Sequence, residues 1–176
     1  MKAVLMGLAL GLAGYTLGAP LAAARSSPTV AAPIQLTLIA DDVQRRVQRV
    51  RQRLAVSPGP LTLHYPQWIP GHHAPTGPIN QIAGLQFSAN GQPLAWQRDP
   101  LDVYAFQLTI PEGVSTLEIA FDYLSPTASD QGRVAMTPNL LAIQWHRVLL
   151  YPKGFDTRYL LVAPTLCLPT GWHSAS

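Results

Sequence analysis

The feature that most constrains the fold of this chain is a two-residue alternation of apolar and polar side chains. The alternation is clearest from 104 to 110 and from 117 to 123, where apolar residues hold every second position. Such a period places the apolar side chains on one face of a β-strand. Pro111-Glu112-Gly113 lies between the two runs, and a short turn between two strands is typical of an antiparallel hairpin. We therefore predict strands and not helices.

Further strands and turns follow along the chain. Asn90-Gly91 predicts a tight hairpin turn, because both residues tolerate the positive φ angles that such a turn requires. The 17 prolines and 13 glycines indicate many short elements. Other predicted strands lie at 34–38, 61–65, 140–150, 158–163 and 166–168. Together these patterns predict an all-β fold, an antiparallel β-sandwich of about eight or nine short strands over 34–172.

The segment 43–54 fits two patterns. Val43, Val47, Val50 and Leu54 have a helical spacing, and a basic amphipathic helix would indicate a membrane or nucleic-acid surface. The same segment also fits a strand, with Val50 and Leu54 on one face and three arginines on the solvated face: Arg49, Arg51 and Arg53. Because strands are predicted on both sides, we favour the strand and expect no nucleic-acid partner.

The first 24 residues predict an export signal. Lys2 supplies one positive charge, residues 3–24 carry none, and Ala22-Ala23-Ala24 offers small residues for cleavage. The alternative is an uncleaved anchor, because the apolar run approaches the roughly 20 residues that span a bilayer. We expect an exported protein, periplasmic or extracellular, with no stable membrane span after cleavage, and a flexible lead-in at 25–33.

A single cysteine excludes an internal disulfide. Cys167 is alone in the chain, so an exported domain of this size must depend on its core or on docking to another domain. The formal net charge of +3 is too small to name a partner.

Catalytic motifs are missing from the sequence. Neither glutamate follows a histidine, and no two of the five histidines are four residues apart, so the thermolysin-type zinc motif is absent. There is no Gly-x-Ser-x-Gly elbow and no phosphate-binding glycine loop. We predict no catalytic, cofactor-binding or metal-binding residues in this chain.

The turn at 68–73 is nevertheless a candidate functional feature. It contains Trp68, Pro70 and Gly71, followed by His72 and His73. Adjacent histidines can bind a metal ion, but without neighbouring ligands we favour a tight turn with the histidines on the surface. Within the strand-like run around Trp145, His146 is predicted to be a hydrogen-bonded structural residue.

Several motifs follow one another in an order that turn formation alone does not explain. In order these are Tyr65-Pro66-Gln67-Trp68-Ile69-Pro70-Gly71-His72-His73, Gly77-Pro78-Ile79, Ala89-Asn90-Gly91, Arg98-Asp99-Pro100, Tyr151-Pro152-Lys153-Gly154 and Leu168-Pro169-Thr170-Gly171-Trp172. The set resembles the N-terminal domain of the glycyl aminopeptidase family, which are thermolysin-like zinc metallopeptidases that often carry a PDZ domain. The resemblance implies a β-sandwich that precedes a catalytic domain. The family's zinc ligands and general base have no counterpart here, and residues 173–176 are interpreted as a truncated tail.

The resemblance implies a non-catalytic accessory domain that packs on a catalytic domain absent from this chain. Its expected partners are that domain, which would hold the zinc, and a peptide substrate. We predict that the 68–73 turn, with Trp68, Pro70, Gly71, His72 and His73, faces the substrate cleft. The alternative is a free-standing exported module that binds a carbohydrate or peptide through Trp68 and Trp96. A large exposed apolar patch would favour the partner domain over this alternative.

Overall fold

The computed structural model describes residues 32–69, 71–131 and 135–175. The predicted signal at 1–24, most of the lead-in and Pro70 lie outside the described residues. Within them the chain forms twelve strands and four 3₁₀ turns, and no α-helix. The strands are β1 (Ile34–Ile39), β2 (Val47–Ala55), β3 (Gly59–His64), β4 (Ile82–Ala89), β5 (Gln92–Leu94), β6 (Trp96–Arg98), β7 (Ala105–Ile110), β8 (Thr116–Leu124), β9 (Met136–Thr137), β10 (Leu140–Leu141), β11 (Tyr151–Pro152) and β12 (Val162–Cys167). The 3₁₀ turns are η1 (Ile79–Gln81), η2 (Ser129–Gln131), η3 (Trp145–Val148) and η4 (Thr157–Tyr159).

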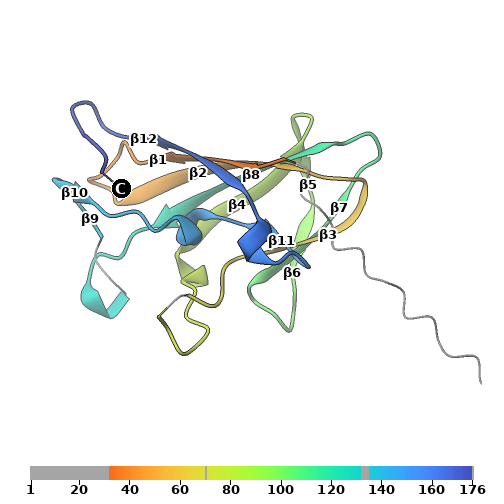
Figure 1. Cartoon of the computed structure of the whole chain (residues 1–176), viewed down its shortest axis with the longest axis horizontal. Helices are drawn as coiled ribbons and strands as arrows, with labels where there is room; N and C mark the ends of the chain where they lie inside the picture. Colours follow the sequence, from red (N-terminus) through yellow and green to blue (C-terminus); the bar gives the residue numbers. More distant parts are fainter. Residues whose placement is uncertain (1–31, 70, 132–134, 176) are drawn as a thin grey trace, which may run out of the picture.

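Two sheets form the sandwich, and they confirm the predicted all-β class. The larger has six strands in the order β12-β1-β2-β8-β4-β5, and the smaller has four in the order β11-β3-β7-β6. Figure 1 shows the larger sheet above, with β3, β6 and β11 of the smaller sheet below it. Strands pair antiparallel except β1 and β12, which pair in parallel among the described strands. The higher strand count arises because five strands have only two or three residues.

The core follows the alternation in the sequence. On β8, Leu117, Ile119, Phe121 and Tyr123 are buried, and they face buried residues of β7 such as Phe106. On β2, Val50 and Leu54 are buried while the three arginines point to solvent. The strand interpretation of 43–54 is therefore confirmed from residue 47 onward, and the helical one is wrong. Two buried glutamines, Gln48 and Gln52, share the inner face of β2.

The predicted strand at 140–150 is wrong. Within the segment, only the first two residues are in a strand, β10, and the turn η3 follows; β11 starts just after it, at Tyr151. Its backbone is held by side chains: Gln52 donates to Leu150 O at 2.5 Å and accepts from Leu150 N at 3.0 Å. The hydroxyl of Tyr65 donates to Arg147 O at 2.9 Å. These side-chain hydrogen bonds satisfy backbone groups that would pair with a neighbouring strand if the segment were one long strand.

The predicted strand at 158–163 begins too early. Asp156 caps the turn η4 by accepting a hydrogen bond from Arg158 N at 3.0 Å, and β12 follows from Val162. The strand predicted at 166–168 is the end of β12.

Prolines occupy most of the outer strands of the two sheets. The larger sheet ends at β12 and β5, which contain Pro164 and Pro93, and the smaller ends at β11, which contains Pro152, and at β6. A proline cannot donate to a further strand, so it protects an edge from unwanted pairing. Partners are therefore expected to contact side chains and loops instead of extending a sheet. In the part of the chain that is described, no helix has the length and apolarity to cross a bilayer.

Candidate functional site

The loop after β3 carries the predicted turn and is closed at its base. The N–H of Gly77 donates to Gln67 O at 2.9 Å, and the N–H of Tyr65 donates to Tyr104 O at 2.9 Å. A Cβ placed on Gly77 would lie 2.0 Å from the carbonyl oxygen of Pro66. The close approach of the two backbones therefore requires glycine at this position.

A second anchor comes from the segment before β7. The hydroxyl of Tyr104 lies 3.2 Å from Pro75 O and 3.1 Å from Gly77 O, and it donates toward both carbonyls. The loop is thus attached to the body of the sandwich at its base and at its returning arm.

Of the predicted site residues, the four that the structure describes, Trp68, Gly71, His72 and His73, are exposed on this loop. The side chain of Trp68 is 65% exposed, and His72 and His73 point to solvent, as predicted for surface histidines. His72 N donates to Ile69 O at 3.0 Å, and His72 Nδ1 lies 2.7 Å from the hydroxyl of Thr76. That the turn faces a substrate cleft remains a prediction.

The structure does not bring Trp68 and Trp96 together. Trp96 is half-buried and packs edge-on against Phe87 and Phe106, with ring centroids 5.8 and 5.6 Å apart. It belongs to the edge of the core. The two tryptophans line different cavities, so they do not form one binding site.

A cavity of about 470 Å³ opens beside Trp68, and we call it the aromatic cavity. Residues of the loop after β3 form one wall, and residues between 146 and 162 form the other. No Asp, Glu, Lys or Arg lines it. Its aromatic and imidazole side chains are those of His64, Tyr65, Trp68, Tyr104, His146 and Tyr151.

Each of the two imidazole rings in the cavity has a nitrogen that lacks a hydrogen bond. His64 Nε2 and His146 Nε2 are buried and have no hydrogen-bond partner. Burial lowers the pKa of His64, and this effect outweighs the opposing charge of Asp102, whose Oδ2 lies 3.8 Å from Nε2. Burial also lowers the pKa of His146, with further lowering from nearby Arg147 and His72. Both pKa shifts favour the neutral form of the imidazole.

Sequence reasoning captured this site only in part. The hydrogen bond predicted for His146 is not present at Nε2, and His64 was not singled out at all. The one available signal for His64 was its place at the end of an alternating run that leads into the motif of Tyr65. Tyr65 itself is buried, which raises the pKa of its hydroxyl, and its bond to Arg147 O fixes η3 against β3.

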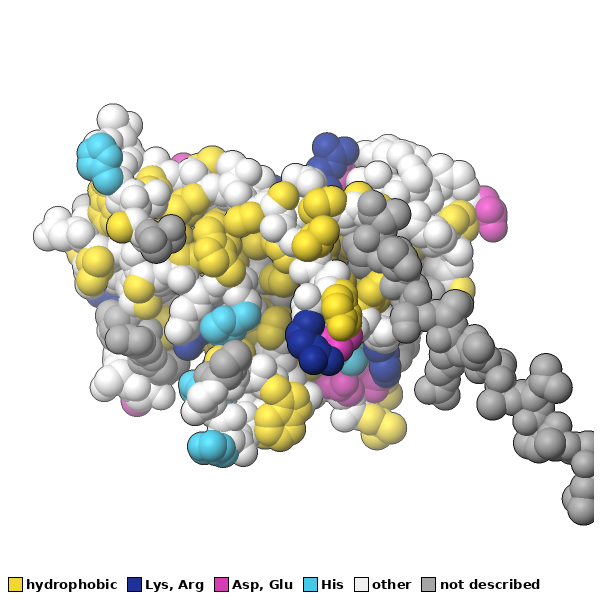
Figure 2. All heavy atoms as spheres, viewed as in Figure 1, with side chains coloured by type: hydrophobic (Ala, Val, Ile, Leu, Met, Phe, Trp, Pro, Cys, Tyr) yellow, Lys and Arg dark blue, Asp and Glu magenta, His cyan; other side chains and the backbone are white. Residues whose placement is uncertain are grey.

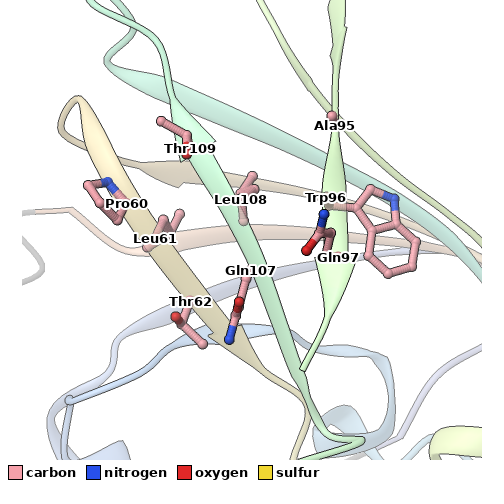
Figure 3. Close-up of a pocket in the computed structure, with 9 residues that line it drawn as sticks. All are labelled: Pro60, Leu61, Thr62, Ala95, Trp96, Gln97, Gln107, Leu108 and Thr109. Atoms are coloured by element: carbon pink, nitrogen blue, oxygen red, sulfur yellow. The ribbon is translucent and has the colours of Figure 1, made fainter. Parts of the chain in front are cut away.

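A second cavity, of about 560 Å³, lies across β3, β7 and β6. Figure 3 shows Thr62 and Gln107 side by side on neighbouring strands, with the ring of Trp96 pointing away from them. Gln107 Nε2 already donates to Asp99 Oδ2 at 2.6 Å. This sheet face mixes apolar and uncharged polar side chains and holds no cluster of reactive groups.

The described residues do not fit a catalytic zinc site. Nowhere among them do three His, Cys, Asp or Glu side chains come close enough to share a metal ion. His72 and His73 are adjacent in sequence but have no third ligand within the described chain. Three protein ligands and a bound water are the usual requirement for zinc catalysis.

The fold and site define a β-sandwich domain that presents an anchored aromatic loop and, among its described residues, no grouped metal ligands. The sequence profile of the peptidase M61 N-terminal domain matches residues 35–176. The chain belongs to this family, and the resemblance to the glycyl aminopeptidases is confirmed.

A solved structure supports the same fold. An aminopeptidase N family protein from Idiomarina loihiensis is 17% identical, with a TM-score of 0.61 over 78% of this chain. The match spans 22% of that protein, so this chain corresponds to only a small part of it. The comparison with curated proteins found no match.

Proposed function

We propose that this chain is the non-catalytic N-terminal accessory domain of an exported zinc aminopeptidase-like protein. It packs on a catalytic domain that this sequence does not contain and helps to shape the substrate cleft. The family match carries this proposal, because it assigns residues 35–176 to the N-terminal domain of a peptidase. The short share of the Idiomarina protein that the chain covers supports it.

The surface offers apolar area for such a partner. Figure 2 shows hydrophobic side chains gathered in a band over the C-terminal segment that ends in β12. Five exposed large hydrophobic residues belong to this segment or to the loop after β3: Trp68, Leu140, Trp145, Tyr159 and Leu161. Contiguous apolar surface on a soluble domain commonly marks a protein interface. This apolar surface favours packing against a partner domain over the free-standing module, for which a closed, polar surface is expected.

The 68–73 turn is the part of this surface that we place at the cleft. Trp68 projects from a loop whose base is anchored by Gly77 and Tyr104, so it can contact a substrate without a large ordering cost. His72 and His73 lie beside it and can donate or accept hydrogen bonds.

A free-standing exported module that binds a carbohydrate or peptide is the second candidate. The aromatic cavity favours it, because its volume is typical of small-molecule sites. Against it, Trp96 packs on Phe87 and Phe106 and lines a different cavity from Trp68, so the two aromatic residues that this candidate would use do not share one site.

The proposal is tested first by assaying the purified chain with zinc and glycyl or alanyl p-nitroanilides. We expect no hydrolysis above the blank, with a known zinc aminopeptidase as positive control. Hydrolysis that co-purifies with the chain and is abolished by a chelator would overturn the non-catalytic assignment. N-terminal sequencing of the secreted product tests export, with cleavage expected near Ala24.

The DNA downstream provides a second test. A His-Glu-x-x-His segment in any frame there would identify the catalytic domain. That domain, co-expressed with this chain, should elute with it as one complex in size-exclusion chromatography. Two separate peaks at micromolar concentration would contradict packing.

A further inference from the structure

The aromatic cavity lies where a bound chain cannot extend the sheet. Its neighbour β11 is the outer strand of the smaller sheet and contains Pro152, which has no N–H. The next N–H, of Lys153, already donates to Thr62 O at 2.9 Å. Strand addition requires a row of free backbone groups. A ligand at this position is therefore recognised by the protein side chains that line the cavity and not by strand pairing.

The cavity wall selects for uncharged groups. No acidic or basic residue lines it, and its surface is made mainly of aromatic rings, Pro66 and aliphatic residues such as Leu149 and Leu160. A charged side chain would lose part of its hydration there, and no residue of opposite charge lines the wall to compensate. Its volume of about 470 Å³ lies within the range of about 300–1,000 Å³ found for ligand sites. A large apolar side chain and its flanking amides fit this space.

Hydrogen bonds within the chain hold both walls of the cavity. Tyr104 and Gly77 fix the loop that carries Trp68, and Tyr65 fixes η3 on the opposite wall. The wall also holds the two unpartnered imidazole nitrogens of His64 and His146. Buried polar atoms without partners are rare, and a small rotation of either ring would offer its nitrogen to a bound amide. Because burial favours the neutral form of both rings, each can donate or accept.

We propose that the aromatic cavity binds a peptide through one large, uncharged apolar side chain, with the imidazoles of His64 and His146 serving the flanking amides. The choice of a peptide over a sugar rests on the proposed function, since an accessory domain of a peptidase meets peptide substrates. Trp68 forms the exposed rim against which the side chain stacks.

The test is a titration of the full, isotope-labelled chain followed by amide NMR shifts. The probes are three capped tripeptides, acetyl-Gly-Phe-Gly-amide and its Lys and Glu counterparts, together with methyl β-glucopyranoside. We expect the Phe peptide to shift amides around the cavity and to bind at least about tenfold more tightly than either charged peptide, a difference of about 1.4 kcal/mol.

Matched variants locate the site. Trp68→Ala should weaken the Phe peptide about tenfold, whereas Trp145→Ala should not change its affinity, because Trp145 is exposed but does not line the cavity. Leu160→Lys places a charge in the wall and should abolish binding. The dispersion of the amide spectrum shows whether each variant is folded. His64→Phe tests the imidazole if Leu160→Lys does not fold, and should weaken the peptide.

Three results would overturn the inference: no localised shifts with the Phe peptide, equal affinity for all three peptides, or binding of the glucoside alone. The proposed function can be refuted independently of the cavity inference. A negative titration with an intact complex between this chain and the catalytic domain refutes only the cavity inference. Peptide binding by a chain that forms no such complex refutes only the packing.

Discussion

Gln52 links the cavity wall to the larger sheet, and its replacement by leucine should destabilise the whole domain. Its side chain is 1% exposed and makes two hydrogen bonds to the backbone of Leu150, as donor and as acceptor. Leu150 lies between η3 and β11, both of which border the aromatic cavity. Gln52→Leu keeps the approximate size of the side chain and removes both bonds.

The expected loss follows from the two backbone groups that remain. Each buried group without a partner costs about 1–3 kcal/mol, so the pair costs about 4 kcal/mol. The buried leucine returns about 2 kcal/mol through the hydrophobic effect. A net loss of about 2 kcal/mol remains, which is a large fraction of the roughly 5–15 kcal/mol by which a folded domain is typically stable.

Urea unfolding followed by tryptophan fluorescence measures this loss. With a slope of about 2 kcal/mol per molar, the midpoint should fall by about 1 M. Gln35→Leu on β1 is the matched control, because Gln35 is exposed, and its midpoint should barely move. Equal midpoints for the two variants would refute the role assigned to Gln52.

A charged replacement at Gln52 separates hydrogen bonding from packing. Burial should raise the pKa of the carboxyl in Gln52→Glu above its value in the unfolded chain. The protonated form can donate to Leu150 O as the amide does. The free energy of unfolding of Gln52→Glu should therefore be close to that of the parent below about pH 4. It should fall below that of the parent as the pH rises through the raised pKa of the carboxyl. A pH-independent loss would contradict this account.

Two further predictions concern the loop and the imidazoles. Gly77→Ala should lower the free energy of unfolding by about 1–3 kcal/mol, because the new Cβ would meet Pro66 O; a melting temperature unchanged within error would show that the loop is not constrained there. The lowered pKa values of His64 and His146 mean that the unfolded chain binds more protons, so stability is complete above about pH 6.5 and is lost as the pH falls. The double variant His64→Gln/His146→Gln should unfold in urea with less change between pH 7 and pH 5 than the parent, and an identical change would exclude these two histidines as the cause.

Long alternating strands could be predicted from the sequence because burial on one face requires the alternation. On β8 the period extends over nine residues, and each buried side chain is two positions from the next. For β2 the pattern alone allowed a helix, and only the neighbouring strands decided the outcome. The pairing of β1 with β12 had no local signal, because it joins segments from the two ends of the domain.

The errors lie where distant side chains replace regular backbone pairing. The segment 140–150 is apolar enough for a strand, but Gln52 binds it from 98 residues away and Tyr65 from 82. No local pattern reports such bonds. The same reason limits the site: the motif around Trp68 was visible in the sequence, whereas His64, Tyr104 and His146 meet it only through the fold.

The parallel pairing of β1 with β12 has a consequence for the chain during synthesis. β1 has the sequence IQLTLI, which contains no charge and no proline and is typical of segments that assemble into fibrils. Until residues 162–167 emerge from the ribosome, nothing in the finished fold can cover that side of β1. β12, which contains a proline, thus covers the aggregation-prone strand β1. A chain cleaved shortly before β12 would be at risk of amyloid growth.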